Sequence, residues 1–393
     1  MVKLCITYSL LVFLVLAAIP HVILETVSTS LIQGVLRNSK KSNTLFSPVL
    51  LQDGLTQLYF GAEGNTAAEL KSLLQLPGSS KSEAIDLYAH TNRELPQNVE
   101  INMANRLFVA EKAQILEEYQ EQIKSLFDNT VGRVNFGNSA ETVDIINTWF
   151  AEHTRQKITN MIDKTSDDTI AMLLSAIYFN GRWKHPFDKS STKKAKFYSL
   201  NDEGEYKSIF VDTMLINADF RSNPIQELDA EIIDIPYANS NVSMVILLPN
   251  QKDGIDKLVS NLHKFHAHQL TPHGSRHNEY KTLLQLPKFK FEFKMELIPV
   301  LKELGVIDLF SKAANLEKIT NNNPPIKVEK VIQKAMIEVD EIGSTAAAAQ
   351  VLEIVFLSGT LNPRRFIVDR PFVFLIRDFE RVYFAGRVGN PNQ

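Results

Sequence analysis

The chain has 393 residues, of which 44% are hydrophobic, and this is enough to bury the core of one large domain or of two ordinary ones. Its formal net charge of −3 gives no electrostatic reason to expect nucleic acid as a partner, so we predict that the partner is another protein. No internal repeat and no low-complexity linker interrupts the sequence, which favours a single domain.

The first residues are typical of a secretory signal peptide. Lys3 supplies one positive charge, and an apolar run from Leu10 to Ile19 follows it. This run is too short to span a bilayer comfortably. We therefore expect residues 1–18 to be removed and residues 19–393 to be secreted, with a retained membrane anchor as the alternative. The only cysteine, Cys5, lies inside this leader, so the mature chain would have no disulfide and no thiol nucleophile.

Helical spacing dominates the first half of the chain. Helices are predicted at Glu25–Arg37, Leu50–Phe60, Thr66–Leu74, Ser82–Glu94, Glu117–Phe127 and Thr142–Ile158, and strands at Val99–Ala110 and Val131–Phe136. Thr169–Phe179 is almost entirely apolar, which is typical of a strand that is buried on both faces in the middle of a sheet.

Strands dominate the second half. They are predicted at Glu231–Pro236, Val242–Pro249, Thr282–Phe293, Ile326–Glu338, Phe372–Arg377 and Val382–Val388, with helices at Gly254–Leu262 and Leu297–Leu304. Helices come mostly first and strands mostly later, without the regular alternation of a doubly wound fold. This order predicts an α+β fold.

The stretch from Glu341 to Thr360 has no single preferred secondary structure. Four alanines, Ala346–Ala349, favour a helix, whereas Gly343 before them and the β-branched run Val351–Phe356 after them favour a strand. The final Ser/Gly/Thr residues are typical of an exposed loop. We interpret this ambiguity between helix, strand and loop as a functional feature in itself.

Motifs for common catalytic chemistry are absent from the sequence, since it contains no G-x-S-x-G, no H-E-x-x-H and no glycine-rich phosphate loop. We predict no enzymatic activity and no cofactor, with a triad of scattered Ser, His and Asp residues as the alternative. Five of the nine histidines lie close together, and their polar surroundings favour a solvated loop over a metal site. They are His263, His266, His268, His273 and His277.

Asn241-Val242-Ser243 fits the pattern for N-linked glycosylation and follows a turn-like segment. We predict a sugar on Asn241 at the tip of a hairpin. The alternative is an unmodified asparagine, because the motif also runs into a predicted strand.

Several short motifs share an order and spacing that run from about residue 25 to the end. They include Phe46-Ser47-Pro48-Val49, Ile146-Asn147 with Trp149, Ala176-Ile177-Tyr178-Phe179-Asn180-Gly181 with Trp183, Leu286-Pro287-Lys288-Phe289, Ile337-Glu338-Val339-Asp340-Glu341 with Gly343, and Val368-Asp369-Arg370-Pro371-Phe372. Together they resemble the serpin family of serine protease inhibitors.

This resemblance implies a serpin fold with a large central mixed sheet, smaller barrel-like sheets, about nine helices and an exposed reactive loop at about 341–362. In that family a protease cleaves the loop, the loop inserts into the large sheet, and the covalently attached protease is distorted. The implied function is a secreted suicide-substrate inhibitor. The alternative is a non-inhibitory serpin that acts as a carrier, storage or binding protein.

The resemblance assigns the hinge of the loop to Glu341, Gly343, Ser344, Thr345, Ala346, Ala347, Ala348 and Ala349. Small side chains suit a segment that has to slide between two strands, although an inert alanine-rich surface loop is the alternative. Strand alternation places Ser344, Ala346, Ala348 and Gln350 on one face, which we expect to point inward. Gln350 replaces the usual Thr, and a buried amide needs hydrogen-bond partners worth roughly 1–3 kcal/mol.

Counting from Glu341, as the family does, places the scissile bond at Leu357-Ser358. A leucine at this position implies a chymotrypsin-like, elastase-like or cathepsin-G-like serine protease as the partner, and cleavage after Phe356 would give a similar specificity. Arg364 and Arg365 lie too far along the chain for productive insertion.

Other family positions form two groups. Glu341 and Lys288 match a pair at the top of the large sheet, with Trp183 beside it. A polar latch in the same sheet is altered: Ser47 is kept, but Leu50, Ser175 and Gln333 replace the usual Ser, Asn and His, which we interpret as one coordinated repacking.

Two negative expectations concern partners. The Ser82–Glu94 segment corresponds to the heparin-binding helix of some relatives and offers only Arg93, so we predict no strong glycosaminoglycan site. We also expect a monomer that binds neither nucleic acid nor membrane.

Overall fold

The computed structural model describes residues 27–76, 78, 80–89, 94–264, 279–321, 326–344 and 363–393. The predicted leader, most of the histidine-rich segment and the loop residues 345–362 lie outside these ranges. Among the described residues, no helix combines the length and apolarity needed to cross a membrane, and no group of three or more His, Cys, Asp or Glu side chains is placed to hold a metal ion.

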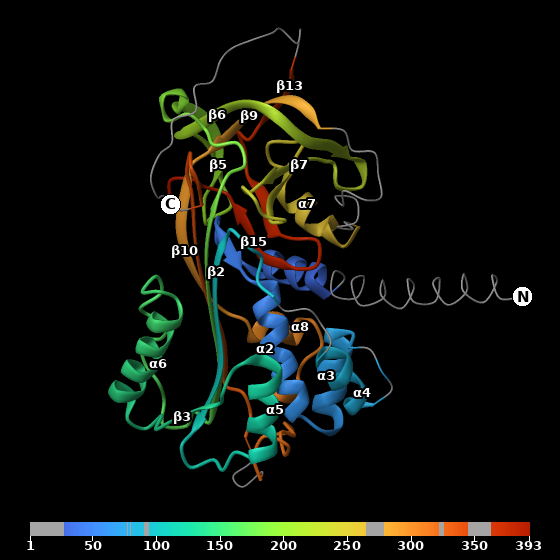
Figure 1. Ribbon diagram of the computed structural model, residues 1–393, viewed down its shortest axis with the longest axis vertical. Coiled ribbons are helices and arrows are strands. Elements are labelled where there is room, and N and C mark those ends of the chain that lie inside the picture. The colour runs from blue at the N-terminus through green and yellow to red at the C-terminus, as the bar shows by residue number, and fades with distance from the viewer. Residues whose placement is uncertain are drawn as a thin grey trace, which may run out of the picture.

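A six-stranded mixed sheet forms the lower half of the molecule in Figure 1. Its order is β10 (Phe289–Glu296), β11 (Lys330–Val339), β4 (Ala171–Arg182), β2 (Glu100–Ala110) and β3 (Gly132–Val134), and the two-residue β12 (Gly343–Ser344) also pairs with β4. Strand β4 is central and buried along nearly its whole length, as its apolar sequence predicted.

A nine-stranded sheet forms the upper half (Figure 1). Its order is β1 (Thr44–Phe46), β15 (Val382–Val388), β14 (Phe372–Arg377), β8 (Ser243–Pro249), β7 (Ala230–Pro236), β6 (Tyr206–Ile225), β9 (Tyr280–Pro287) and β13 (Arg364–Ile367), with β5 (Lys193–Leu200) also paired to β6.

The strand predicted at Thr282–Phe293 is wrong as a single element. The structure divides it into β9 and β10, which belong to different sheets. The division falls at Pro287-Lys288, where proline has no N–H to continue a ladder. The sequence prediction also missed β1, β5, β6 and β13.

Eight α-helices lie within the described residues. They are the helix at residues 27–38, α2 (Pro48–Gly61), α3 (Gly64–Leu74), α4 (Lys81–Ala89), α5 (Glu117–Phe127), α6 (Ser139–His153), α7 (Ile255–Asn261) and α8 (Ile298–Glu303). Helix α6 stands on one side of the six-stranded sheet, and α2, α3 and α5 lie on the other (Figure 1). The predicted α+β fold is therefore confirmed.

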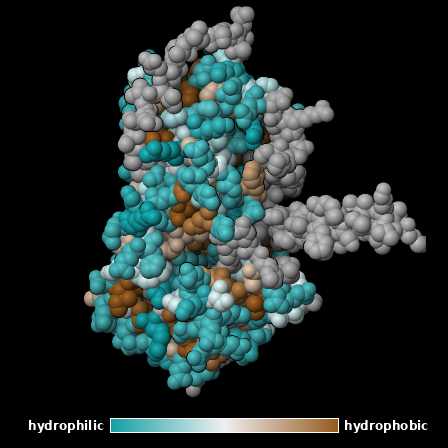
Figure 2. All heavy atoms as spheres, viewed as in Figure 1, coloured by the Kyte–Doolittle hydropathy of each residue, from teal (hydrophilic) through white to brown (hydrophobic). Residues whose placement is uncertain are grey.

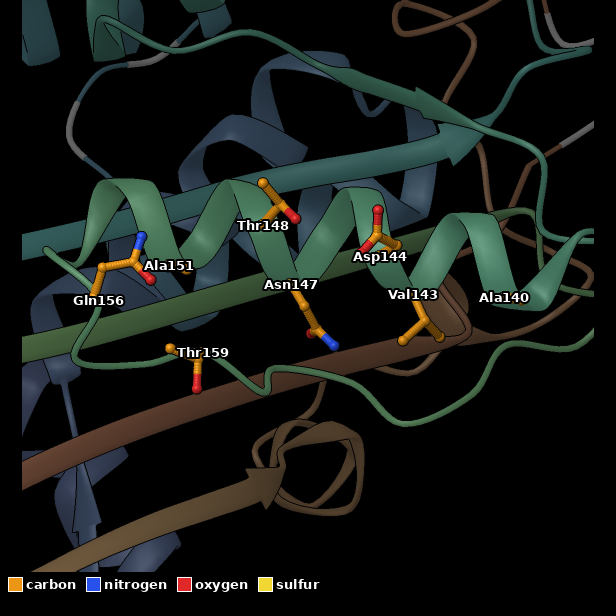
Figure 3. Close-up of a pocket in the computed structure, with 8 residues that line it drawn as sticks. All are labelled: Ala140, Val143, Asp144, Asn147, Thr148, Ala151, Gln156 and Thr159. Atoms are coloured by element: carbon orange, nitrogen blue, oxygen red, sulfur yellow. The ribbon is translucent and has the colours of Figure 1, made fainter.

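The segment after α6 is fastened to this helix by Asn147. Its side chain points from α6 toward that segment (Figure 3), where Oδ1 accepts hydrogen bonds from the N–H groups of Met161 and Ile162 at 2.8 and 3.0 Å. Its Nδ2 donates to the Ile162 carbonyl at 2.9 Å. One amide thus satisfies three backbone groups, which explains why an Asn stands at this helical position.

Three buried apolar clusters hold the layers together. One lies among the helices beside α2, one between the two sheets, and a small one under α6. On the face that Figure 2 shows, hydrophilic residues cover most of the surface and hydrophobic residues gather in separate patches.

Candidate functional site

The seam between the parallel strands β4 and β11 is closed at one end and open at the other. Ladder pairs run from Lys330 with Met172 to Met336 with Tyr178 and stop there. Strand β11 continues to Val339, paired on its far side with β10, and β4 continues to Arg182. The upper parts of the two central strands are therefore no longer bonded to each other.

A tight turn returns the chain to this opening. The Asp340 carboxylate accepts hydrogen bonds from the N–H groups of Ile342 and Gly343 at 2.9 and 3.1 Å, and the Asp340 N–H donates to the Gly343 carbonyl at 2.9 Å. Asp favours such turns because its short side chain bonds to the backbone two or three residues on. The turn reverses the chain, so that β12 runs antiparallel to β4.

Gly343 makes the closest approach in this turn. A Cβ atom at this position would lie 1.9 Å from the Gly181 carbonyl oxygen and 2.7 Å from the Arg182 Cα. Both are backbone atoms that no side-chain rotation can move away. Only glycine therefore allows β12 to pair with the end of β4 as observed.

Trp183 and Phe187 hold the turn from the other side. The Trp183 N–H donates to the Ile342 carbonyl and its Nε1 to the Asp340 carbonyl, both at 2.9 Å, while the Phe187 N–H donates to the Glu341 carbonyl at 2.8 Å. The Trp183 ring is buried and stacks on Tyr237 with centroids 4.7 Å apart. Residues 340–342 are thus fixed by hydrogen bonds from the Trp183 and Phe187 N–H groups and from the Trp183 indole, and Tyr237 supports the Trp183 ring.

The Glu341 side chain is only 5% exposed, and its negative charge is paired with the positive charge of Lys288. Lys288 Nζ donates to both carboxylate oxygens at 3.1 and 2.9 Å, and the Thr192 hydroxyl donates to Oε1 at 2.8 Å. Burial alone would raise the pKa of Glu341, but these charge-assisted hydrogen bonds outweigh it and hold the pKa below its usual value. The carboxylate therefore remains charged at neutral pH.

The four latch residues meet at the closed part of the seam. Gln333 of β11 is buried; its Nε2 donates to the Ser47 carbonyl and to the Ser175 hydroxyl, both at 3.1 Å, and its Oε1 accepts the Ser47 N–H. Ser47 is the N-cap of α2 and accepts the Leu50 N–H at 3.3 Å. One glutamine therefore ties β11, β4 and the start of α2 together.

Leu50 takes part in this cluster through its backbone. Its carbonyl accepts a hydrogen bond from the Asn105 side chain at 3.0 Å, and Asn105 lies opposite Ser175 in the β2–β4 ladder. The apolar Leu50 side chain packs in the cluster between the sheets. The Leu50 side chain therefore contributes apolar packing where a polar side chain was expected. The N–H and the carbonyl of Leu50 both keep hydrogen-bond partners.

The remaining predicted site residues belong to the reactive loop and to the glycosylation motif. Thr345–Ala349, Gln350, Leu357 and Ser358 lie outside the described residues, and of Ser344 only the backbone is described. Asn241 is exposed in the turn between β7 and β8.

Three residues of the site were missed by sequence reasoning. They are Asp340, Thr192 and Tyr237, which shape the turn, bind Glu341 and support Trp183. The Asp340-x-x-Gly343 spacing was a turn signal that pointed to the first of them. Thr192 and Tyr237 lie far from the turn in sequence, and no local signal marked them.

Comparison with known proteins identifies the class to which this arrangement belongs. A family model described as Serpin (serine protease inhibitor) matches residues 23–391, so the chain belongs to the serpin family.

Among curated relatives, the chain is similar to Serine protease inhibitor 42Dd of Drosophila melanogaster. The two are 33% identical over 369 residues, which cover 93% of this chain and 95% of the relative. It is also 32% identical to human Serpin B4, over 90% of this chain and 95% of that one.

Among solved structures, the fold is similar to that of Serpin48 of the insect Tenebrio molitor, with a TM-score of 0.81 and 28% identity over 94% of this chain and 97% of the other. Human thyroxine-binding globulin complexed with its ligand has a TM-score of 0.80 at 22% identity, over 94% and 99% of the two chains. This second likeness concerns the fold alone.

Proposed function

We propose that the protein is a secreted suicide-substrate inhibitor of serine proteases. A protease cleaves the loop near Leu357-Ser358, and the freed loop inserts between β4 and β11 with the protease still attached. The observation that carries this proposal is the open upper seam, into which the chain already turns at β12.

The direction of the chain suits insertion. Because β4 and β11 are parallel, a strand between them that is antiparallel to one is antiparallel to both. Strand β12 already runs antiparallel to β4. After cleavage, the residues that follow Ser344 would extend down the seam without a further change of direction, and each inserted residue would add backbone hydrogen bonds to the sheet.

The register of β12 also supports a buried position for Gln350 after insertion. If this register continued along the inserted loop, Ala346 would lie opposite Phe179, Ala348 opposite Ile177 and Gln350 opposite Ser175. Directly opposed residues share a face, and the Ser175 side chain faces Gln333 and the start of α2. The inserted Gln350 amide would thus arrive between Ser175 and Gln333, where polar partners offset the cost of burying it.

A leucine before the scissile bond supports a chymotrypsin-like or elastase-like protease as the target. The signal-peptide pattern supports secretion. The exposed position of Asn241 supports glycosylation there. The alternative is a non-inhibitory serpin that carries or stores a ligand.

Incubation with chymotrypsin and with elastase separates the two functions. Inhibition predicts a complex that survives SDS, with cleavage after Leu357 identified by mass spectrometry of the released peptide. A catalytically inactive protease, whose nucleophilic serine is replaced, is the control and should give no such complex. Clean cleavage by the active enzymes with no complex would refute the proposal and favour a carrier.

A further inference from the structure

A groove that takes no part in the proposed inhibition lies where β8 and β14 leave the nine-stranded sheet. It has a volume of about 1070 Å³, and its walls include segments 94–97, 236–243 and 377–381. Leu95 and Phe379 line it and are 44% and 50% exposed. Large hydrophobic side chains are costly to leave in water, so two of them in one groove indicate a surface that is covered by something apolar.

Asn241 stands on the wall of the same groove. Strands β8 and β14 are antiparallel, and their ladder ends with Ser243 opposite Arg377. Asn241 lies two residues before Ser243. Phe379 lies two residues after Arg377, so it leaves the sheet at the same edge as Asn241. Both side chains are exposed and both line the groove, so a group attached to the Asn241 amide begins at the edge of the groove that Phe379 lines.

The loop that carries Phe379 is held in one shape. The Asp378 Oδ1 accepts hydrogen bonds from the N–H groups of Glu380 and Arg381 at 2.8 and 2.7 Å. The other carboxylate oxygen accepts the hydroxyl of the buried Tyr383 at 2.7 Å. The backbone on both sides of Phe379 is therefore fixed, so that little order has to be imposed on it when a ligand packs there.

Two side-chain hydrogen bonds join the other walls. Arg381 Nη2 donates to the Glu94 carbonyl at 3.0 Å and holds segment 94–97 beside the loop that carries Phe379. Asn98 Nδ2 donates to the Asn239 carbonyl at 2.7 Å and holds the same segment beside the turn between β7 and β8. The three segments that meet in the groove are thus tied to one another, and the groove is formed before any ligand enters it.

The lining suits a sugar. A pyranose ring carries C–H groups on its faces and hydroxyl groups at its rim. Aromatic faces are electron-rich and attract such C–H groups, and the exposed Phe379 ring offers a face of this kind. Gln97 and Glu380 also line the groove, and their amide and carboxylate groups accept hydrogen bonds from hydroxyl groups. Apolar contact surface with a few polar groups around it is the usual composition of a small-ligand site.

We propose that the first sugars of an N-linked chain on Asn241 fold back into this groove and pack on Phe379 and Leu95. The attached sugar is part of the function proposed above, on which this inference rests. Attachment keeps the sugar at an effective concentration of about 1 mM or more, so weak contacts are enough to hold it in the groove. The sugar then covers both apolar side chains, which no longer face water.

Release of the sugar from the folded protein tests this contact. The full chain is secreted by cultured human cells, and a peptide-N-glycosidase cuts the bond between Asn241 and the first sugar, with the loss of mass followed over time. Packing on Phe379 shields this bond, and cleavage follows the population in which the sugar has left the groove. Phe379→Ala should therefore lose its sugar at least about threefold faster than the wild type. After denaturation in detergent, both should lose it at the same rate.

Two further variants sharpen the result. Leu95→Ala should also accelerate release, whereas Phe210→Ala is the matched control, since Phe210 is 67% exposed on β6 outside the groove, and it should behave as the wild type does. Wild-type rates in both groove variants would overturn the proposal and assign the apolar pair to another partner. An unmodified Asn241 in the secreted protein would also overturn it. Failure of the inhibitory function is distinguishable, because the protease assay is independent of the sugar.

Discussion

Replacing Gln333 by Leu tests whether one glutamine holds the closed part of the seam. The change nearly conserves volume, but it removes the amide that bonds to both backbone groups of Ser47 and to the Ser175 hydroxyl. Three buried polar groups lose their partner, at about 1 kcal/mol each or more, so the native state should lose about 3 kcal/mol. With an unfolding entropy near 0.8 kcal/mol per degree for a chain of this length, the Tm should fall by about 4 °C.

The assay is thermal unfolding at a fixed scan rate, because unfolding of large proteins is often irreversible. Gln226→Leu is the matched control, since Gln226 is exposed, and its Tm should change by less than about 1 °C. If Gln333→Leu unfolds within about 1 °C of the wild type, the hydrogen bonds at Gln333 do not hold the seam and the reasoning fails.

Three further changes act at the hinge. Glu341→Gln removes the negative charge and with it the ion pair to Lys288. Because the folded-state pKa of Glu341 is lowered, the wild type should be more stable than this variant above pH 4.5. The difference in Tm should shrink as the pH falls below that value. A constant difference across this pH range would contradict the ion pair. Gly343→Ala places a Cβ against the Gly181 carbonyl and should cost about 1–3 kcal/mol, measured by denaturant unfolding, and an unchanged midpoint would show that β12 does not need this approach. Ala346→Arg should turn the inhibitor into a substrate, with cleaved chain in place of SDS-stable complex on gels, and unchanged inhibition would mean that the hinge does not insert.

Local sequence signals predicted most of the elements that build the six-stranded sheet. The apolar run at Thr169–Phe179 marked the central strand because both faces of β4 are buried. The same logic failed for Thr282–Phe293, where two strands of different sheets follow each other across Pro287-Lys288. Alternation within a short run shows which side chains are buried, and the sheet to which a strand belongs depends on distant partners.

The candidate site was likewise predicted only in part. The resemblance to serpins brought Glu341, Lys288 and Trp183 together from distant parts of the sequence, and the structure places these three in contact around one turn. Thr192 was not foreseen because it reaches Glu341 from a 3₁₀ turn that no hydrophobic pattern predicts. Gln333 was recognised as a departure from the family, but only the structure shows that its amide serves three groups at once.

Insertion of the cleaved loop into the β4–β11 seam is the central claim, and the thermal stability of the cleaved chain tests it most directly. The chain is cut in the loop by a protease that is then removed, and intact and cleaved forms are heated side by side. Insertion adds a central strand to the six-stranded sheet, so the cleaved form should unfold at a much higher temperature than the intact one. A cleaved form that unfolds at the same temperature or lower would contradict the account.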